Sequence, residues 1–385
     1  MRRVFLQVLV MVVVVPLAAA CGLGAAGSVR VAGDPPAREG KAAARGDLLT
    51  VAESSGVKAT ARHDDVVALL DRLAAAAPGR ARRVEMGTTV EGRSIPMLVV
   101  ADPPVATPEE AAEQVKRGKV VVLMIGNIHG GEVDGKEALP MLAREVLLHE
   151  GEAAHPLLKD LVLVFAPIYN ADGNERVGKD NRPGQVGPEE GMGIRENAQG
   201  FDLNRDFVKL EAPETRALVR VLNTWDPAVF IDTHTTNGSY HGYVLTFEGP
   251  KAPAGDGAII EYVRDEMLPR VSRGLEGGRG IRTWFYGDFA EGHTKWVTFP
   301  PLPRYGTNYV GLRNRISILS EGYSYAPYED RVMATLHFVR ACLEDVAANK
   351  EKVKRLLREA DEGAVRAGKE PREGDVIVLR AKAAP

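Results

Sequence analysis

Residues 120–135 read VVVLMIGNIHGGEVDG, an apolar run that leads into a glycine-rich turn. A continuous apolar run of this kind predicts a strand that is buried on both faces. The turn holds His129 and, three residues later, Glu132, and two glycines between them let the backbone direct both side chains toward one point. Imidazole and carboxylate groups are zinc ligands, and a catalytic zinc site needs three protein ligands and one open position. His129 and Glu132 are therefore two candidate ligands.

Further apolar runs alternate with helical patterns through the middle of the chain. Continuous apolar strands between helices predict an α/β domain whose sheet is covered by helices on both faces. In such folds functional groups gather where strands end in loops. The predicted strands are a pair within 82–102 and single strands at 119–127, 161–170, 228–235 and 315–322, and the predicted helices are 64–77, 136–150 and 212–225.

The composition sets limits on the class of protein. The 385 residues are 45% hydrophobic and 26% charged, which is typical of a globular protein. This length allows one large domain or two small ones. A formal net charge of −3 gives no basic surface, so nucleic acid is not an expected partner.

Residues 1–20 have the layout of a secretory signal peptide, with two arginines, an apolar run to Leu17 and three alanines before Cys21. The apolar run is short for a membrane span, so a transmembrane anchor is the less favoured alternative. Small residues before a cysteine resemble the bacterial lipobox, in which that cysteine receives a lipid, and plain cleavage after Ala20 fits the same pattern. Both alternatives predict an exported protein of the cell envelope or periplasm, which is either attached to the membrane through Cys21 or secreted.

The rest of the chain divides by composition. Residues 21–50 are rich in glycine, alanine and charge and predict a flexible tether. Residues 51–361 carry the alternating pattern and predict one domain, while residues 362–385 lack a clear helical pattern and predict a C-terminal tail. Cys342 lies in an apolar helical pattern, which predicts a buried core thiol.

The third zinc ligand has to come from elsewhere, because the patterns H-E-x-x-H and H-x-x-E-H are both absent at His129. His234 is the candidate, since it follows the apolar run 229–231 and is expected at the end of a buried strand. Surface or core positions are expected for the remaining histidines, which are His63, His149, His155, His241, His293 and His337.

Asn204 and Arg205 are adjacent and form an amide and guanidinium pair. Such a pair is suited to binding a carboxylate through two hydrogen bonds. Arg205 has a structural alternative, an ion pair with Asp202 or Asp206. The pair therefore predicts either a carboxylate-binding site or a stabilising bridge.

Two further charged residues have positions that suit catalysis. Arg195 supplies a cation that could polarise a carbonyl group, and Arg182 in the same glycine-rich stretch is a rival for that role. Glu321 lies at the end of an apolar strand, where it could take a proton from a water molecule at the zinc. Its structural alternative is to cap the N-terminus of a helix.

These segments occur in the order found in the zinc carboxypeptidases of the carboxypeptidase A type, which the sequence resembles over about residues 60–345. Chance is a poor explanation for an ordered set of this kind. Residues 204–218 and 308–328 are similar to a bacterial branch of the family. The matching pieces are the H-x-x-E of His129 and Glu132, the N-x-D-G-x-E of residues 170–175, Arg195, the N-R pair of Asn204 and Arg205, His234 and Glu321.

The resemblance implies a fold and a metal. The fold is an α/β domain with a mixed eight-stranded sheet between helices, here within residues 51–361. The metal is one zinc ion per chain, held by His129, Glu132 and His234. Zinc lowers the pKa of its bound water toward neutrality, which suits a hydrolase.

The resemblance also implies a reaction, the hydrolysis of the last peptide bond of a peptide. Glu321 would act as general base and then as general acid. Arg195 would stabilise the oxyanion, and Asn204 with Arg205 would bind the terminal carboxylate of the substrate.

The sequence departs from the A-type enzymes where a substrate side chain would bind. Those enzymes use a mobile tyrosine ahead of the catalytic glutamate, and this chain has Phe299 at the matching spacing, with neither Tyr305 nor Tyr309 assigned to the role. The position that sets side-chain preference falls near Gly306 and carries no acid that would select a basic residue. An anionic or polar substrate is indicated by three arginines, Arg304, Arg313 and Arg315.

Three functions remain open, and a zinc carboxypeptidase is favoured among them. The first alternative is a zinc amidohydrolase of the aspartoacylase or succinylglutamate-desuccinylase type, which acts on small N-acyl amino acids and shares the H-x-x-E motif. The second alternative is a peptide-binding envelope protein without catalysis, which the complete set of ligand types and Glu321 disfavours.

Overall fold

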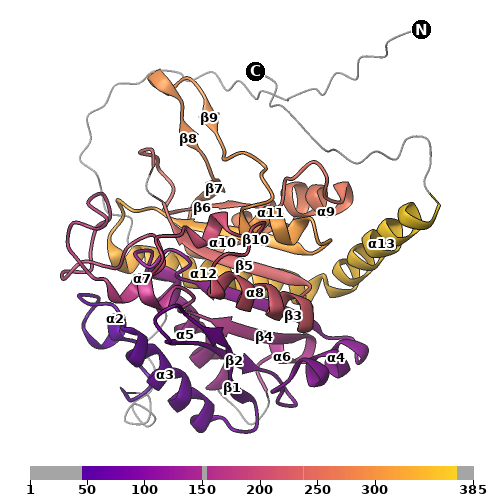
Figure 1. The fold of residues 1–385 in the computed structure, drawn as a ribbon, viewed down its shortest axis with the longest axis horizontal. Coiled ribbons are helices and arrows are strands. Elements are labelled where there is room, and N and C mark those ends of the chain that lie inside the picture. Colours follow the sequence, from indigo (N-terminus) through magenta and orange to yellow (C-terminus); the bar gives the residue numbers. More distant parts are fainter. Residues whose placement is uncertain (1–45, 150–153, 237, 371–385) are drawn as a thin grey trace. The chain divides into compact units, whose positions relative to one another are not determined.

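The computed structural model describes residues 46–149, 154–236 and 238–370. Its main element is an eight-stranded mixed sheet with the strand order β1-β2-β4-β3-β5-β10-β6-β7, so the predicted sheet is confirmed (Figure 1). The strands of this sheet are β1 (Ala81–Thr88), β2 (Ser94–Val100), β3 (Val120–Gly126), β4 (Leu161–Ala166), β5 (Val229–Thr235), β6 (Leu245–Glu248), β7 (Thr283–Phe285) and β10 (Ile316–Gly322). A separate two-stranded ribbon consists of β8 (Asp288–Phe289) and β9 (Trp296–Val297).

Helices connect most of these strands. The helices of the first half are α2 (Val51–Ser54), α3 (His63–Ala76), α4 (Pro108–Lys116), α5 (Asp134–Leu147), α6 (Leu157–Asp160), α7 (Ala171–Glu175) and α8 (Pro213–Thr224). The later helices are α9 (Gly257–Glu261), α10 (Leu268–Arg279), α11 (Gly306–Gly311), α12 (Tyr328–Ala348) and α13 (Lys350–Lys369), with a π-helical turn at Tyr262–Met267. Short 3-10 turns lie at Leu203–Arg205 and Glu291–His293.

The centre of the sheet is parallel and fully buried. Strands β4, β3, β5 and β10 pair in parallel in that order, and every residue of the four is buried. This burial explains why these strands read as continuous apolar runs instead of alternating patterns. The flanking strands β2 and β6 are antiparallel to their neighbours β4 and β10.

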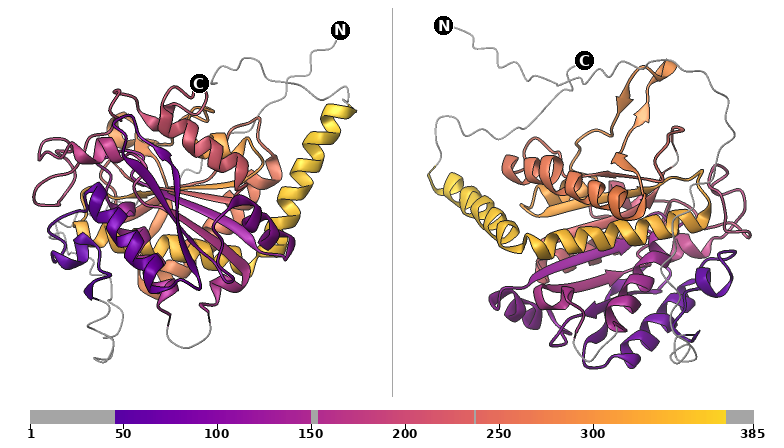
Figure 2. Two further views of the ribbon diagram at one scale, coloured as in Figure 1. Left: turned by 60° about the horizontal axis from the view of Figure 1, so that its bottom comes forward. Right: turned by 180° about the vertical axis from the view of Figure 1, so that it is seen from behind.

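Two hydrophobic cores lie on the two faces of the sheet. Along β3, Val122 belongs to one core and Leu123 to the other, as the alternation of side chains in a strand requires. The first core includes residues of α3, α5, α10 and α12, and the second includes residues of α4 and α8. Figure 2 shows the sheet between these helices, so the predicted sandwich of helices around a sheet is confirmed.

The parallel pairing brings the ends of β3, β5 and β10 to one edge of the sheet. His234 in β5 lies directly opposite Glu321 in β10, and the loop after β3 carries His129. Gly130 in this loop packs against the backbone of α7, since a Cβ there would lie 2.3 Å from the carbonyl carbon of Gly173. The fold therefore assembles residues that are about 200 positions apart in the sequence.

Some expectations about the chain were wrong in detail. The helical pattern around Cys342 belongs to α12, and a second helix, α13, follows it after Asn349. The predicted tail from residue 362 begins inside α13, which continues to Lys369. Cys342 is buried in α12, as predicted. The signal peptide, Cys21 and most of the predicted tether lie outside the described residues.

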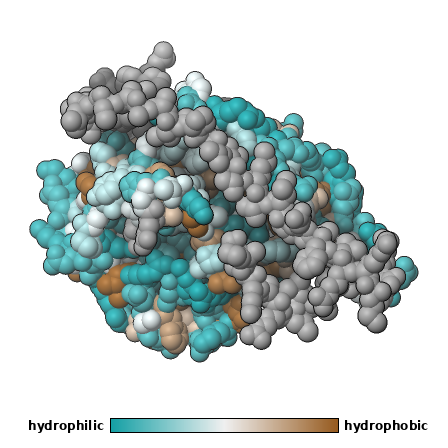
Figure 3. All heavy atoms as spheres, turned by 90° about the horizontal axis from the view of Figure 1, so that it is seen from above, coloured by the Kyte–Doolittle hydropathy of each residue, from teal (hydrophilic) through white to brown (hydrophobic). Residues whose placement is uncertain are grey.

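One face of the molecule shows how polar and apolar residues share the surface. Figure 3 shows a largely hydrophilic face with separate hydrophobic patches, which is normal because folded proteins expose much apolar area. Within the described ranges, no helix combines the length and the apolarity that a membrane span requires.

Candidate functional site

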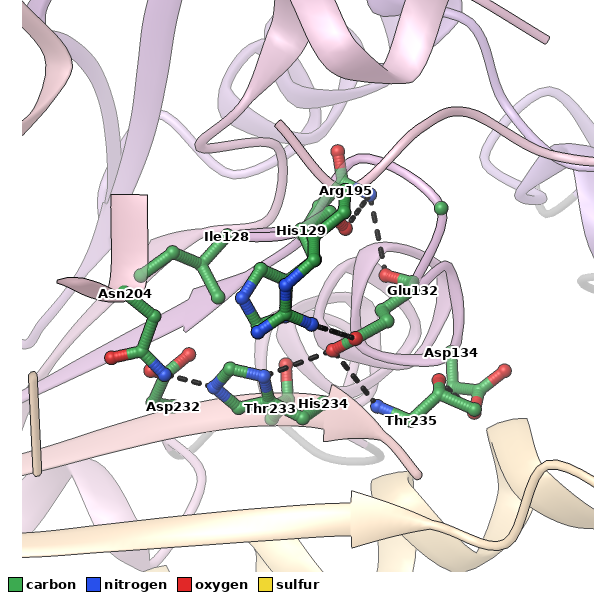
Figure 4. Close-up of polar contacts among 12 residues, drawn as sticks. Ile128, His129, Glu132, Asp134, Arg195, Asn204, Asp232, Thr233, His234 and Thr235 are labelled. Atoms are coloured by element: carbon green, nitrogen blue, oxygen red, sulfur yellow. Dashed lines mark hydrogen bonds and ion pairs between the residues drawn. The ribbon is translucent and has the colours of Figure 1, made fainter. Parts of the chain in front are cut away.

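Three predicted ligands converge at the edge of the sheet. His129 and Glu132 come from the loop between β3 and α5, and His234 comes from the end of β5. One ligand atom from each residue lies within 4.8 Å of the others, and all three side chains are buried. Figure 4 shows both imidazole rings directed toward the Glu132 carboxylate.

The Glu132 carboxylate bridges the two rings. Its Oε1 lies 2.9 Å from Nδ1 of His129, and its Oε2 lies 2.9 Å from Nδ1 of His234. The backbone N–H of Thr235 also donates to Oε2, at 3.2 Å. Two imidazole nitrogens and one carboxylate that face a common point are the donor set of a catalytic zinc site, so these residues fit zinc.

The second nitrogen of each ring lies beside another carboxylate. Nε2 of His129 is 3.1 Å from Oδ1 of Asp202, and Nε2 of His234 is 2.8 Å from Oδ2 of Asp232. Such outer carboxylates orient metal-bound histidines and raise their basicity. The sequence motifs do not identify either aspartate as a partner of a zinc ligand, although Asp232 lies two residues before His234 and so on the same face of β5.

The charges of the cluster oppose the effect of burial. Burial alone would raise the pKa of Glu132, but His129 and Arg182 hold that pKa well below its ordinary value. Burial alone would lower the pKa of His234, but Asp232 and Glu132 raise it. The cluster is thus a set of mutually stabilising charges.

All seven predicted site residues line one cavity of about 260 Å³. Tyr286, Phe299 and Tyr305 line it as well. Of these three aromatic residues, the sequence motifs point to Phe299 and Tyr305 but not to Tyr286. The predicted residues in the lining are His129, Glu132, Arg195, Asn204, Arg205, His234 and Glu321.

Glu321 is part of strand β10, with its carboxyl group in the cavity. Burial raises the pKa of this carboxyl to about 8. The alternative role, as a cap of the following helix, is wrong because α12 begins at Tyr328 and its N-cap position is Pro327.

Arg195 and Arg182 both reach the ligand cluster. Arg195 donates from Nε to Oδ2 of Asp202 at 2.9 Å, and its Nη1 lies 3.7 Å from Oε1 of Glu132. Arg182 donates from Nη2 to the same Glu132 oxygen, but it lines a neighbouring pocket of about 320 Å³ that also includes Tyr325. Only Arg195 of the two lines the cavity that contains Glu321.

Asn204 and Arg205 lie in the 3-10 turn before α8. Oδ1 of Asn204 accepts a hydrogen bond of 2.8 Å from the backbone N–H of Gly306. The guanidinium of Arg205 lies 4.2 Å from the centroid of the Tyr305 ring. Its Nη1 is 3.7 Å from Oδ2 of Asp202, so the ion pair considered for Arg205 is present, and Arg205 lines the cavity as well.

Arg313 and Arg315 do not reach the cavity. Arg313 donates to Oδ1 of Asn223 at 2.7 Å, and Arg315 pairs with Asp226 and Asp361. Their use as an indication of an anionic substrate was therefore wrong. Their side chains bind Asn223, Asp226 and Asp361 instead.

The carboxylates beside the two histidine ligands, Asp202 and Asp232, give a prediction about metal affinity. Asp232→Asn removes the charge beside Nε2 of His234, and we expect it to weaken zinc binding by about 10- to 100-fold. A competition titration with a zinc chelator measures the change. Asp226→Asn is the control, because Asp226 is an exposed aspartate that pairs with Arg315 away from the cluster. Equal zinc affinity in wild type and Asp232→Asn would contradict the orienting role.

Known proteins share this fold and part of this sequence. The sequence model described as zinc carboxypeptidase matches residues 66–248. Mouse carboxypeptidase D is 34% identical over 165 residues, which cover 38% of this chain and 12% of that protein. The human carboxypeptidase N catalytic chain is 28% identical over 280 residues, which cover 63% of this chain and 58% of that protein. The chain therefore spans less than two thirds of the length of these relatives.

Solved structures agree at the level of the fold. The metallo-carboxypeptidase from Burkholderia cenocepacia is similar with a TM-score of 0.52 and 18% identity, over 72% of this chain and 68% of that one. Carboxypeptidase A from Helicoverpa armigera is similar with a TM-score of 0.52 and 16% identity, over 80% and 81%. Together with the cluster of His129, Glu132 and His234, these findings show that residues 66–248 match the zinc carboxypeptidase family and that the chain has a carboxypeptidase fold.

Proposed function

We propose that the protein is a zinc metallocarboxypeptidase, a hydrolase that removes residues from the C-terminus of peptides. One observation carries the proposal: the zinc ligands, a buried carboxyl and an amide-guanidinium pair line the same cavity. A cavity of about 260 Å³ is on the scale of an amino acid side chain with its carboxylate, so it suits the end of a chain. Bound zinc would supply a Lewis acid and a water of lowered pKa.

The protein residues divide the remaining work. The raised pKa of Glu321 is that of the metal-free cluster, and a zinc cation beside the carboxyl would lower it. Glu321 can then take a proton from the attacking water and return it to the leaving amine, which is general base and then general acid catalysis. Arg195 presents a cation to the oxyanion that develops on the carbonyl group. Asn204 and Arg205 bind the terminal carboxylate, which sets the last peptide bond beside Glu321.

The activity is tested by incubating the zinc-loaded protein with a mixed peptide pool and following the peptides by mass spectrometry. Ladders shortened from the C-terminus support the proposal and give the residue preference. Hydrolysis of N-acyl amino acids without peptide shortening would instead favour the amidohydrolase alternative. Zinc binding without any hydrolysis would favour a binding protein.

The carboxylate site gives a separate prediction. Arg205→Ala removes the guanidinium, and we expect kcat/KM on peptides with a free C-terminus to fall by about 10- to 100-fold, since a charge-assisted hydrogen bond contributes about 1.5–3 kcal/mol. The effect should lie mainly in KM. Peptides with an amidated C-terminus are the control substrates, because they lack the charge that Arg205 would bind. An equal loss on both kinds of peptide would contradict the role.

We also propose that the protein is exported. The support is the signal-like layout of residues 1–20, with two arginines, an apolar run and three alanines before Cys21. Attachment through a lipid on Cys21 is the specific form of this proposal. Cell fractionation of the wild type and of Cys21→Ser tests it, since loss of the lipid should move the protein from the membrane to the soluble fraction.

A further inference from the structure

Tyr286 lines the cavity and carries a phenol hydroxyl, and no sequence motif points to this residue. The residue directly follows β7, and its backbone N–H donates to the carbonyl of Phe247 at 2.7 Å. This bond fixes its main chain to β6 at the edge of the sheet. The side chain lines the cavity together with Glu321 and Phe299, and its ring centroid is 5.9 Å from that of Phe299.

The hydroxyl of Tyr286 has no hydrogen-bond partner among the residues that the structure describes. Burial raises the pKa of this hydroxyl, and the negative charges of Glu321 and Asp288 raise it further. A phenol in these surroundings keeps its proton and is a hydrogen-bond donor. Because no described protein group occupies this hydroxyl, it is available to a ligand that accepts a hydrogen bond from it.

The other aromatic residues of the region are not equivalent. Phe299 has no hydroxyl, and the ammonium of Lys251 lies 3.6 Å from the centroid of its ring. Tyr305 lies at the carboxylate end of the cavity, with Arg205 over its ring. Tyr309 packs against Phe207 and does not line the cavity. Tyr286 therefore offers a free hydroxyl in the cavity that Phe299 and Glu321 also line.

We infer that Tyr286 is a catalytic residue of this chain, and that its hydroxyl donates a hydrogen bond to a substrate oxygen at the reacting end of the cavity, beside Glu321. The inference rests on the proposed function, because it assumes that the C-terminal carboxylate of the substrate binds Asn204 and Arg205. In this chain the hydroxyl comes from the end of β7, whereas the position that matches the tyrosine of the A-type enzymes holds Phe299.

The test uses Tyr286→Phe, which removes one oxygen atom and keeps the ring. We expect kcat/KM on a peptide that the wild type cleaves to fall by about 10- to 100-fold. This is the effect expected when one hydrogen bond to a charged oxygen, or to an oxygen that becomes charged in the reaction, is lost. Zinc content should stay the same. Tyr309→Phe is the matched control and should leave kcat/KM unchanged. Adding Phe299→Tyr to Tyr286→Phe should restore part of the activity, because it returns a hydroxyl to the same region.

A binding measurement decides the inference independently of turnover. Benzylsuccinate carries one carboxylate for Asn204 and Arg205 and a second for the reacting end of the cavity. Calorimetry on the zinc-loaded proteins should give a Kd that is about 10-fold higher for Tyr286→Phe than for the wild type.

The outcomes separate the two proposals. A wild type that binds benzylsuccinate but cleaves no peptide contradicts the proposed function, while the ratio of the two Kd values still decides the role of Tyr286. Equal Kd values, no binding to the wild type, or the same loss in Tyr309→Phe would overturn the role of Tyr286.

Discussion

Glu321→Gln should lower kcat by about 10²- to 10⁴-fold, the contribution of a general acid-base group. Glutamine keeps the shape of the side chain and its place in β10, but its amide does not accept a proton at neutral pH. Because Glu321 is not one of the three ligands that converge, zinc content should stay at one per chain. Steady-state kinetics with zinc analysis of the same preparation measures both quantities.

A second buried glutamate provides the control for Glu321→Gln. Glu214 in α8 is fully buried, and its pKa is also raised by burial, but it does not line the cavity. Glu214→Gln therefore makes the same chemical change at a similar depth, and kcat should stay within about twofold of the wild type. If Glu321→Gln kept wild-type kcat, the assignment of the proton transfer to Glu321 would be wrong.

The sequence predicted the centre of the fold because the centre is where burial dominates the choice of residues. Strands β3, β4, β5 and β10 are buried on both faces, so their residues are apolar without interruption and the strand ends are easy to find. His129 and His234 could be recognised because each follows or ends such a strand. Glu132 could then be recognised as a further ligand because only a short glycine turn separates it from His129.

Other parts of the site depend on contacts that leave no local pattern. Asp202 reaches His129 across 73 positions of sequence, and Tyr286 reaches the cavity from a three-residue strand that has no periodicity to detect. Arg313 and Arg315 carried the right charge for a substrate site, but their partners Asp226 and Asn223 could be known only from the packing. Long-range pairing therefore limited the prediction more than local structure did.

A buried ion pair behind the zinc ligands shows how such packing supports the site. Arg331 in α12 is fully buried and donates from Nε to both carboxylate oxygens of Asp134, at 3.1 and 3.2 Å. Its Nη1 donates to the carbonyl of Val186 at 2.7 Å and to that of Ala326 at 2.8 Å. Asp134 also accepts a hydrogen bond from the hydroxyl of Thr235, at 2.7 Å. One guanidinium thus joins the start of α5, the end of β5 and two loops.

Arg331→Met should therefore lower the free energy of unfolding by about 3–5 kcal/mol, because it leaves the Asp134 carboxylate buried without its counter-charge. Urea unfolding of the zinc-free protein measures the loss. Adding Asp134→Asn should recover part of it, since the uncompensated charge is then gone. Arg264→Met is the control: Arg264 and Asp265 form an exposed pair, and such pairs contribute less than about 1 kcal/mol. A loss as small as that of Arg264→Met would show that the buried pair does not stabilise the fold around the zinc ligands.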